Sequence, residues 1–543
     1  MLLISIDSTR RDLLSCYGRR PKHLPEQATS PTLDRLAREG VLMEDACADT
    51  SWTLVSHMSL FTGEPSIVHA VDEGSHIYGG ATPLMTEVFQ ESGYRTAGFF
   101  SGPFLEGSFG FERGFDRYEA RYGTALDAAS RRVDALRAAA GGVEDVALQN
   151  PEYRAALHDL MKTCYEDVSS SMVTDGVLDE LDRHAQSDQP FFVFAHYFDN
   201  HYDYVPPAEH DVFDPEYQGT IDGTNFLHSE LIAGPKQGAG PRERVVSERD
   251  LERIFALYEG EMLWTDAEIG RIVARLEELE LLDNTLIVVT SDHGDEFFEH
   301  GSIGHRRTLF EEVVAVPLIL RFPPRLPQGA RVDGPVSLVD LPATMFELAG
   351  LPPVRGTAST SFLPLVEGAE DAGERGVFGR VVHSYGAEER VPGKGGQTVR
   401  SLRVYVTETY RKGDVKITRR RTWTKPFLAS GPKLTKWWNA KAEREKKNEV
   451  LFWVDLGQHP DEPADRHSED WSDPRARAVL QEFHDRYDEL LERRATSVSG
   501  GEDDRIQAMI QGLGYTEGDE EGAAPVDTDE YVLPAPGAAV LDA

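Results

Sequence analysis

The stretch from Leu286 to Glu296 constrains the fold of this chain more than any other. It opens with the aliphatic and β-branched run Leu-Ile-Val-Val-Thr, which is typical of a buried strand. Asp292 and His293 follow where that strand is expected to end. Because open α/β sheets bind ligands beyond the carboxyl ends of their strands, this pair is expected at a binding edge. A carboxylate and an imidazole suit a divalent metal, although an isolated Asp-His pair is more often part of a turn.

A second run of the same design stands at the start of the chain, where Asp7 directly follows the apolar residues Leu2 to Ile6. Two strands that are far apart in sequence and both end in possible metal ligands predict one composite site at a sheet edge. Residues 1–117 and 190–350 alternate short apolar runs with helical stretches, which predicts a doubly wound α/β domain. Between them, residues from about 119 to 186 are predicted to form a helical insertion.

The rest of the chain predicts a smaller unit and a tail. We expect one large domain that carries this site over residues 1–375 and a sheet-plus-helix α+β subdomain over residues 376–497, with a helix near residues 474–494. The remaining residues, 498–543, are acidic and rich in Gly, Ala and Pro, which predicts a partly disordered tail.

Motifs along nearly the whole chain resemble, in the expected order, those of the sulfatase family within the alkaline phosphatase superfamily. The first matches are ISIDSTRRDLLSCYG at 4–18 and SPTLDRLAREG at 30–40, and later ones include DNHYDYVPP at 199–207 and PVSLVDLPATMFELAGLP at 335–352. The resemblance implies an alkaline-phosphatase-like mixed sheet flanked by helices. It also implies a metal-dependent enzyme that acts on an ester.

The nucleophile position departs from the family pattern. Sulfatases carry Cys or Ser at the head of Cys-x-Pro-Ser-Arg-x-x-Leu-x-Thr-Gly, and that residue is oxidised to formylglycine. The equivalent stretch here starts at Thr53, with Val55 in place of Pro and His57 in place of Arg. Threonine cannot become an aldehyde, so water would have to displace an ester on Thr53 directly. Phosphoryl groups accept such displacement, and superfamily phosphodiesterases and phosphoglycerol transferases use Thr at this position. The alternative is that Thr53 is only a helix N-cap.

The resemblance also implies the remaining site residues. Asp7, Asp292 and His293 match metal ligands, and the Thr53 hydroxyl would complete the set. His201 matches a histidine that contacts the bound anion. His305 stands where many members carry a substrate-binding Lys, and it could donate to the anion or protonate the leaving group.

Two further assignments are weaker. Arg10 and His57 could bind substrate or orient Thr53 and its metal. We expect one divalent cation, Mn²⁺, Mg²⁺, Zn²⁺ or Ca²⁺, and His293 in place of Asn favours the first three over Ca²⁺. A second metal could in principle use Asp199 with His201 and His305, but the spacing of Asp199 and His201 does not match the usual longer interval.

Three functions compete. The first is a hydrolase or phosphoryl transferase that acts on a phosphoric or sulfuric ester through a Thr nucleophile, with a small-molecule, glycan or lipid ester as substrate. The second is a sulfuric ester hydrolase that works without formylglycine. The third is a non-catalytic binding protein on the same fold, and the intact metal-ligand motifs count against it.

The charge balance bears on partners and habitat. Acidic residues number 93 against 56 basic ones, of which only 12 are Lys, and the formal net charge is −37. Such an excess argues against nucleic acid as a partner. No apolar run approaches the roughly 18 residues of a membrane helix. With three cysteines and a strand at the N-terminus, the sequence predicts a cytoplasmic protein. Heavy acidity with Arg in place of Lys predicts adaptation to high salt, and the alternative is an ordinary acidic cytosolic protein.

The salt hypothesis has a direct test. If the excess negative charge is tolerated because salt screens it, the melting temperature is expected to rise as KCl is added from low to molar concentration. Thermal unfolding over a KCl series measures this. Loss of stability as salt is raised above a low concentration would exclude the halophilic hypothesis.

Overall fold

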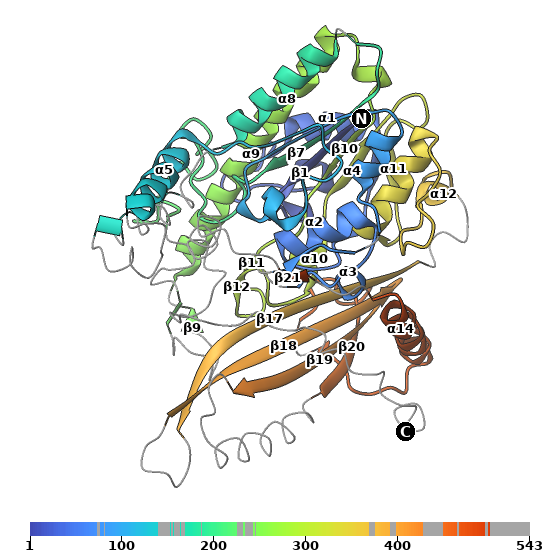
Figure 1. Ribbon diagram of the computed structural model, residues 1–543. Helices are drawn as coiled ribbons and strands as arrows, with labels where there is room; N and C mark the ends of the chain where they lie inside the picture. Colours follow the sequence, from blue (N-terminus) through green and yellow to red (C-terminus); the bar gives the residue numbers. More distant parts are fainter. Residues whose placement is uncertain are drawn as a thin grey trace.

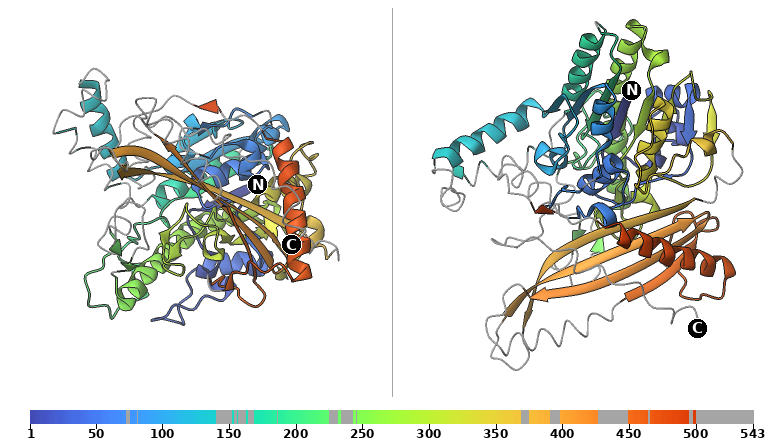
Figure 2. Two further views of the ribbon diagram at one scale, coloured as in Figure 1. Left: turned by 90° about the horizontal axis from the view of Figure 1, so that it is seen from below. Right: turned by 45° about the vertical axis from the view of Figure 1, so that its right-hand side comes forward.

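The computed structural model describes residues 1–499 apart from 73–75, 81, 140–151, 154–155, 157–162, 164–168, 186, 225–231, 234–242, 245, 369–374, 391–397, 427–448, 464–465 and 495–497. Within this part, two bodies are apparent: a large α/β domain, and below it a long antiparallel sheet with one helix alongside (Figures 1 and 2). Among the described helices, none combines the length and apolarity that a membrane crossing requires.

An eight-stranded mixed sheet forms the centre of the large domain. Only one strand, β14, runs antiparallel to its neighbours, and the other strands share one direction. The fold-class prediction is therefore confirmed. In spatial order the strands are β15 (Ala330–Val332), β2 (Val41–Met43), β14 (Leu318–Arg321), β10 (Ile287–Thr290), β1 (Leu2–Ile6), β7 (Phe191–Tyr197), β5 (Arg95–Phe100) and β6 (Arg117–Ala120).

The two strands singled out in the sequence are direct neighbours. β1 pairs in parallel with β10 on one side and with β7 on the other, and Ser5 lies opposite both Thr290 and His196. Every residue of β1 and β10 is buried, which explains their continuous apolar composition. Because parallel strands in register end at the same edge, Asp7 and Asp292 leave the sheet side by side.

Helices cover both faces of this sheet (Figure 1). On one face α8 (Ser170–His184) and α9 (Glu248–Glu278) pack together with α1 (Pro31–Glu39). On the other lie α2 (Thr53–Thr62), α4 (Met85–Glu91) and α11 (Leu341–Ala349). All ten residues of α2 are buried, so this helix belongs to the core. The shorter elements are α3 (Ser66–His69), α10 (Glu311–Val314), α12 (Leu363–Val366), the sheet of β3 (Ala46–Cys47), β13 (Ala315–Val316) and β16 (Val336–Ser337), and the pairs β11 (Glu296–Phe297) with β12 (Ile303–Gly304), β4 (His76–Ile77) with β21 (Val498–Ser499) and β8 (Ile232–Ala233) with β9 (Glu243–Arg244).

The stretch predicted as a helical insertion divides into different parts. Strand β6 enters it at the start and joins the central sheet. Helix α5 (Thr124–Ala139) follows, whereas α8 packs on β5 and β7 and is part of the main domain. Much of residues 140–168 lies outside the described residues, so the predicted insertion remains a prediction there.

The C-terminal unit is a four-stranded antiparallel sheet of β17 (Gly376–Arg390), β18 (Thr398–Lys412), β19 (Val415–Pro426) and β20 (Glu449–Asp455). Helix α14 (Pro474–Glu492) packs on it through Phe483 and Tyr487. The strands are longer than the short β-type runs that the sequence offers here, such as residues 402–409 and 415–423. The tail from residue 500 lies outside the described residues.

A buried lysine ties this sheet to the large domain. Lys416 of β19 is 2% exposed, and its Nζ lies 2.9 Å from Glu311 Oε1 and 2.7 Å from Glu462 Oε2. Nζ also donates to the Leu309 carbonyl oxygen. Burial alone would raise the pKa of Glu311, but Lys416 and Arg411 outweigh it and lower that pKa to about 2. The carboxylate therefore stays ionised, and it depends on a cation supplied by the other domain.

Replacing Lys416 should destabilise the whole molecule. Lys416→Met leaves two buried carboxylates without their counter-charge, which is expected to cost about 3–5 kcal/mol of unfolding free energy. Lys22→Met is the matched control, because Lys22 pairs with Glu252 at the surface and its side chain is 66% exposed. That pair is expected to contribute less than about 1 kcal/mol. Urea denaturation measures the free energy of unfolding of both variants. An equal loss of unfolding free energy in the two would contradict the role given to Lys416.

Candidate metal and ester site

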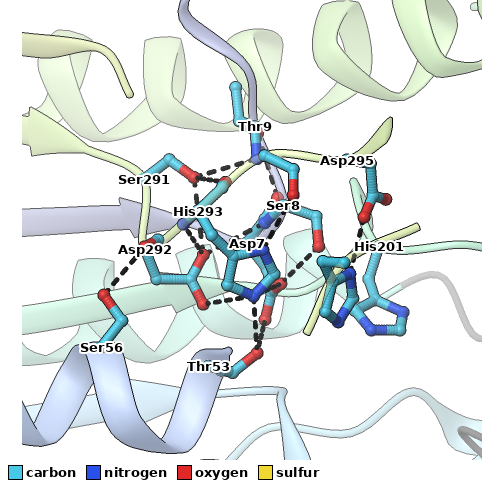
Figure 3. Close-up of polar contacts among 12 residues, drawn as sticks. Asp7, Ser8, Thr9, Thr53, Ser56, His201, Ser291, Asp292, His293 and Asp295 are labelled. Atoms are coloured by element: carbon cyan, nitrogen blue, oxygen red, sulfur yellow. Dashed lines mark hydrogen bonds and ion pairs between the residues drawn. The ribbon is translucent and has the colours of Figure 1, made fainter. Parts of the chain in front are cut away.

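Three predicted metal ligands meet at the carboxyl ends of β1 and β10 (Figure 3). The ligand atoms of Asp7, Asp292 and His293 all lie within 4.8 Å of one another. His293 Nε2 is 3.3 Å from Asp292 Oδ2 and 3.9 Å from Asp7 Oδ1. All three side chains are buried.

The two carboxylate oxygens of Asp292 have different surroundings. Its Oδ1 accepts hydrogen bonds from the backbone N–H groups of Ser8 (3.1 Å) and His293 (3.0 Å). Its Oδ2 is buried and has no hydrogen-bond partner among the described residues. A buried carboxylate oxygen that accepts no hydrogen bond, beside a second carboxylate and an imidazole, fits a divalent cation. Asp7, Asp292 and His293 would hold it.

The electrostatics of the cluster point the same way. Burial raises the pKa of Asp7 to about 7, although His293 and a hydrogen bond from Ser8 act against it. Burial would lower the pKa of His293, but the charges of Asp292 and Asp7 outweigh it and raise that pKa. Two buried carboxylates thus lack sufficient positive charge, and a cation would supply it.

Thr53 faces this cluster from the first turn of α2 (Figure 3). Its Oγ1 lies 3.2 Å from His293 Nε2 and 3.4 Å from Asp7 Oδ2, and the residue is 1% exposed. The N-cap residue is Trp52, whose backbone is still extended, so Thr53 is the first helical residue and does not act as the cap. The positive end of the helix dipole lies at this hydroxyl, which favours negative charge there.

His57 lies one turn further along α2, and its ring contacts the backbone of Thr53. Its Nδ1 is 2.9 Å from the Thr53 carbonyl oxygen and its Nε2 is 2.9 Å from Ser5 Oγ. The side chain is fully buried, and both ring nitrogens contact protein atoms. This geometry argues against the predicted contact between His57 and substrate, and it favours a positioning role.

Arg10 is held by acidic groups. Its guanidinium donates to both Asp12 carboxylate oxygens at 2.8 and 2.9 Å, to the Asp295 carbonyl oxygen at 3.2 Å, and to Glu299. An arginine engaged in this way anchors the loop after β1. The predicted contact between Arg10 and substrate is therefore disfavoured as well, because the N–H groups of Arg10 already donate to these oxygens.

The two remaining predicted histidines lie next to each other beside the cluster. The ring centroids of His201 and His305 are 5.0 Å apart, and that of His305 is 4.2 Å from that of His293. Burial, followed by the neighbouring histidines, lowers the pKa of both well below the usual range. Both rings thus adjoin the position that a bound anion would share with Thr53.

The alternative second metal set is not assembled. The carboxylate of Asp199 accepts from the backbone N–H groups of Ser169 (2.8 Å) and Ser170 (2.9 Å) at the start of α8, and from Trp264 Nε1 (2.9 Å). Asp199 therefore holds the N-terminus of a helix. Both of its carboxylate oxygens already accept hydrogen bonds there, which disfavours a role for Asp199 in binding a second metal.

The sequence interpretation missed His196 and Asp295. His196 Nε2 lies 3.2 Å from Asp7 Oδ2, and Gly102 makes room for the ring, since a Cβ there would stand 2.7 Å from His196 Cε1. Asp295 Oδ1 lies 2.6 Å from His305 Nδ1. The available signal for His196 was a histidine near the carboxyl end of the otherwise apolar run FFVFA. Asp295 stood three residues beyond Asp292.

The ligand cluster predicts a cation-dependent stability. Divalent cations should raise the melting temperature of the wild-type protein, because they bind only the folded site. Asp7→Asn should abolish that rise, yet leave the metal-free protein as stable or more stable, since it removes one of two facing buried carboxylates. Asp175→Asn is the control, because Asp175 pairs with Arg271 at a half-exposed position on α8, and it should keep the rise. Thermal scans with Mg²⁺, Mn²⁺, Zn²⁺ and Ca²⁺ test this, and an unchanged wild-type melting temperature in all four would contradict the site.

Comparison with known proteins agrees with this fold. The family model described as Sulfatase matches residues 1–351. Human arylsulfatase K is 34% identical over 119 residues, which cover 22% of each chain, so the match spans about a fifth of that relative's length. The N-acetylglucosamine-6-O-sulfatase of Bacteroides thetaiotaomicron is 21% identical over 427 residues, 68% of this chain and 70% of that one. The phosphonate monoester hydrolase of Agrobacterium radiobacter has a similar structure, with a TM-score of 0.61 at 18% identity over 92% of this chain and 96% of its own. Because the family model covers 351 of the 543 residues, the chain belongs to the sulfatase family.

Proposed function

We propose that this protein is a divalent-cation-dependent hydrolase, or phosphoryl transferase, that cleaves a phosphoric or sulfuric ester with Thr53 as the nucleophile. The single observation that carries the proposal is the position of the Thr53 hydroxyl. Its Oγ1 lies 3.2 Å from His293 Nε2, beside both carboxylates of the cluster, and at the positive end of α2. Nothing in this arrangement requires the oxidised side chain that other family members use.

The chain's own residues account for two displacement steps. The Thr53 oxygen attacks the phosphorus or sulfur atom and gives up its proton, the bond from that atom to the leaving oxygen breaks, and the leaving alcohol takes up a proton in return. Water then attacks the Thr53 ester, the bond to Oγ1 breaks, and the hydroxyl is regenerated. A cation bound by Asp7, Asp292 and His293 would lower the pKa of the hydroxyl and offset charge on the ester oxygens. His201 and His305 contact the anion and handle the proton of the leaving group.

Phosphoric esters are favoured over sulfuric esters. A formylglycine ester can break down by elimination from its second hydroxyl, but a threonine ester has no such route. Direct displacement by water is more readily achieved at phosphorus, with a cation present. The sulfuric ester hydrolase stays the second candidate, because the family model and the named relatives favour it.

The cation count and identity follow from the donor set. With Asp199 bound to α8, one cation is favoured over two. An imidazole among the ligands favours Mn²⁺, Mg²⁺ or Zn²⁺ over Ca²⁺. The non-catalytic alternative is disfavoured, since the three ligands and the hydroxyl lie together in one buried cluster.

Substitution of Thr53 tests the nucleophile. Thr53→Ala is expected to lower kcat by at least about 10³-fold, because no other oxygen replaces Oγ1, whereas Thr53→Ser should keep part of the activity. Both variants should keep the cation-dependent rise in melting temperature. Thr50→Ala serves as the control, because Thr50 is also buried and lies three residues earlier in the same segment.

Paired substrates separate the two ester classes. Turnover of bis(4-nitrophenyl) phosphate should exceed that of 4-nitrophenyl sulfate for the wild-type protein. A higher sulfate rate with Thr53 chemically unmodified, as shown by mass spectrometry, would favour the sulfuric ester hydrolase. Full activity of Thr53→Ala on both substrates would mean that Thr53 is not the nucleophile.

A further inference from the structure

Three arginines are buried together on the C-terminal sheet, away from the ester site. Arg380 of β17 and Arg419 and Arg421 of β19 are each at most 3% exposed. In the strand pairing, Arg380 and Arg419 lie opposite Glu408 of β18, one on each side of it. Arg419 also packs against α14, the helix that runs along this sheet (Figure 1). The arginines thus occupy the interior of the C-terminal unit.

Two carboxylates hold these arginines. Glu408 Oε2 accepts from Arg419 Nε at 2.8 Å, and Glu408 Oε1 accepts from Arg421 Nη2 at 2.5 Å and lies 3.8 Å from Arg380 Nε. Burial would raise the pKa of Glu408, but the three arginines outweigh it and lower that pKa, so the carboxylate is ionised. Arg380 Nη1 donates to both carboxylate oxygens of Asp72, at 2.5 and 2.7 Å. Since Asp72 follows α3 of the large domain, the arginine cluster joins the two bodies.

Four guanidinium nitrogens of this cluster lack an acceptor. Among the described residues, Nη1 and Nη2 of Arg419 and Nε and Nη2 of Arg380 are buried without a hydrogen-bond partner. The Arg419 guanidinium lies over the rings of Tyr487 and Phe483, 4.0 and 4.9 Å from their centroids. A guanidinium donates within its own plane, so an acceptor has to approach its edge and not a face covered by these rings. Because buried donors are as a rule hydrogen-bonded, these four nitrogens indicate a bound acceptor.

The charges of the cluster do not balance either. In the ion pairs of the described residues, three guanidiniums face only the carboxylates of Glu408 and Asp72. Glu449, at the start of β20, is exposed to water. Burial raises the pKa of Asp49, near Asp72, to about 7, and its Oδ2 already accepts two hydrogen bonds. A buried positive charge without a partner is costly, and a bound anion would remove that cost, whereas a water molecule would only accept hydrogen bonds.

We propose that Arg380 and Arg419 bind a chloride ion, and that this ion stabilises the contact between the C-terminal sheet and the large domain. One negative charge matches the one guanidinium in excess, whereas a doubly charged phosphate or sulfate would reverse the imbalance. Because the ion binds the folded arrangement only, its stabilisation is specific for the anion and saturates. Screening of the acidic surface, in contrast, depends on ionic strength and not on which monovalent anion is present.

Thermal unfolding in two potassium salts tests this inference. The quantity compared is the melting temperature in KCl minus that in potassium glutamate at equal ionic strength, to which general salt effects contribute equally in all variants. Arg419→Met is expected to lower this difference by about 2–4 °C, because it removes two of the four donors and the excess charge. Arg420→Met is the matched control, since Arg420 is the next residue, is exposed, and lies over Phe310 and Phe452. It should leave the wild-type difference unchanged.

A second measurement locates the ion and needs no variant. Crystals of the wild-type protein grown in KBr are expected to show an anomalous bromide peak within hydrogen-bonding distance of both Arg380 and Arg419. This result remains informative if Arg419→Met fails to fold. Absence of the peak, or an equal change in Arg419→Met and Arg420→Met, would overturn the chloride site. A peak together with an unchanged difference in a folded Arg419→Met protein would show an adventitious ion only, and would overturn the stabilising role.

Discussion

Two carboxylates buried face to face are the constraint on which most of the site depends. Parallel pairing of β1 and β10 places Asp7 and Asp292 at one edge, and the surrounding groups compensate for their charge. Backbone N–H groups donate to the Asp292 carboxylate, and the Ser8 hydroxyl donates to the Asp7 carboxylate. The Ser56 hydroxyl, on α2, donates to the Asp292 carbonyl oxygen at 2.8 Å. The last contact fixes the start of α2 against the cluster. The position of Thr53 therefore follows from the same requirement that makes a cation favourable.

Much of the large domain could be predicted because its signals are local. The apolar runs that form β1 and β10, and the ligands that follow them, are continuous in sequence and need no distant partner for their interpretation. The antiparallel course of β14 could not be predicted, because strand direction depends on how the chain returns to the sheet. The extent of β17 to β20 also exceeded the short runs, since β pairing extends strands beyond their apolar residues.

The residues that surround the metal ligands could not be predicted from the sequence, for a different reason. His196 matters through Asp7, which lies 189 residues away, and Arg10 is held by Glu299 at a separation of 289 residues. The sequence shows that such side chains exist, but their partners are chosen by the fold. The sequence therefore left two roles open for Arg10 and His57, substrate binding or orientation of Thr53 and its metal, and the structure places both side chains against protein groups. Asp295 had its partner only ten residues away, but a loop and a hairpin must fold before the two meet.

The buried contact between Lys416 and Glu311 limits how this protein could be shortened or recombined. An isolated fragment ending near residue 375 would carry Glu311 without Lys416 and Arg411, the cations that balance it. That fragment would either protonate the carboxyl group or open the segment around it, which lies only a few residues after His305. Truncation at this predicted domain boundary is therefore expected to destabilise the large domain. Exchange of the C-terminal sheet between related proteins would succeed only if the incoming strand brought its own buried cation.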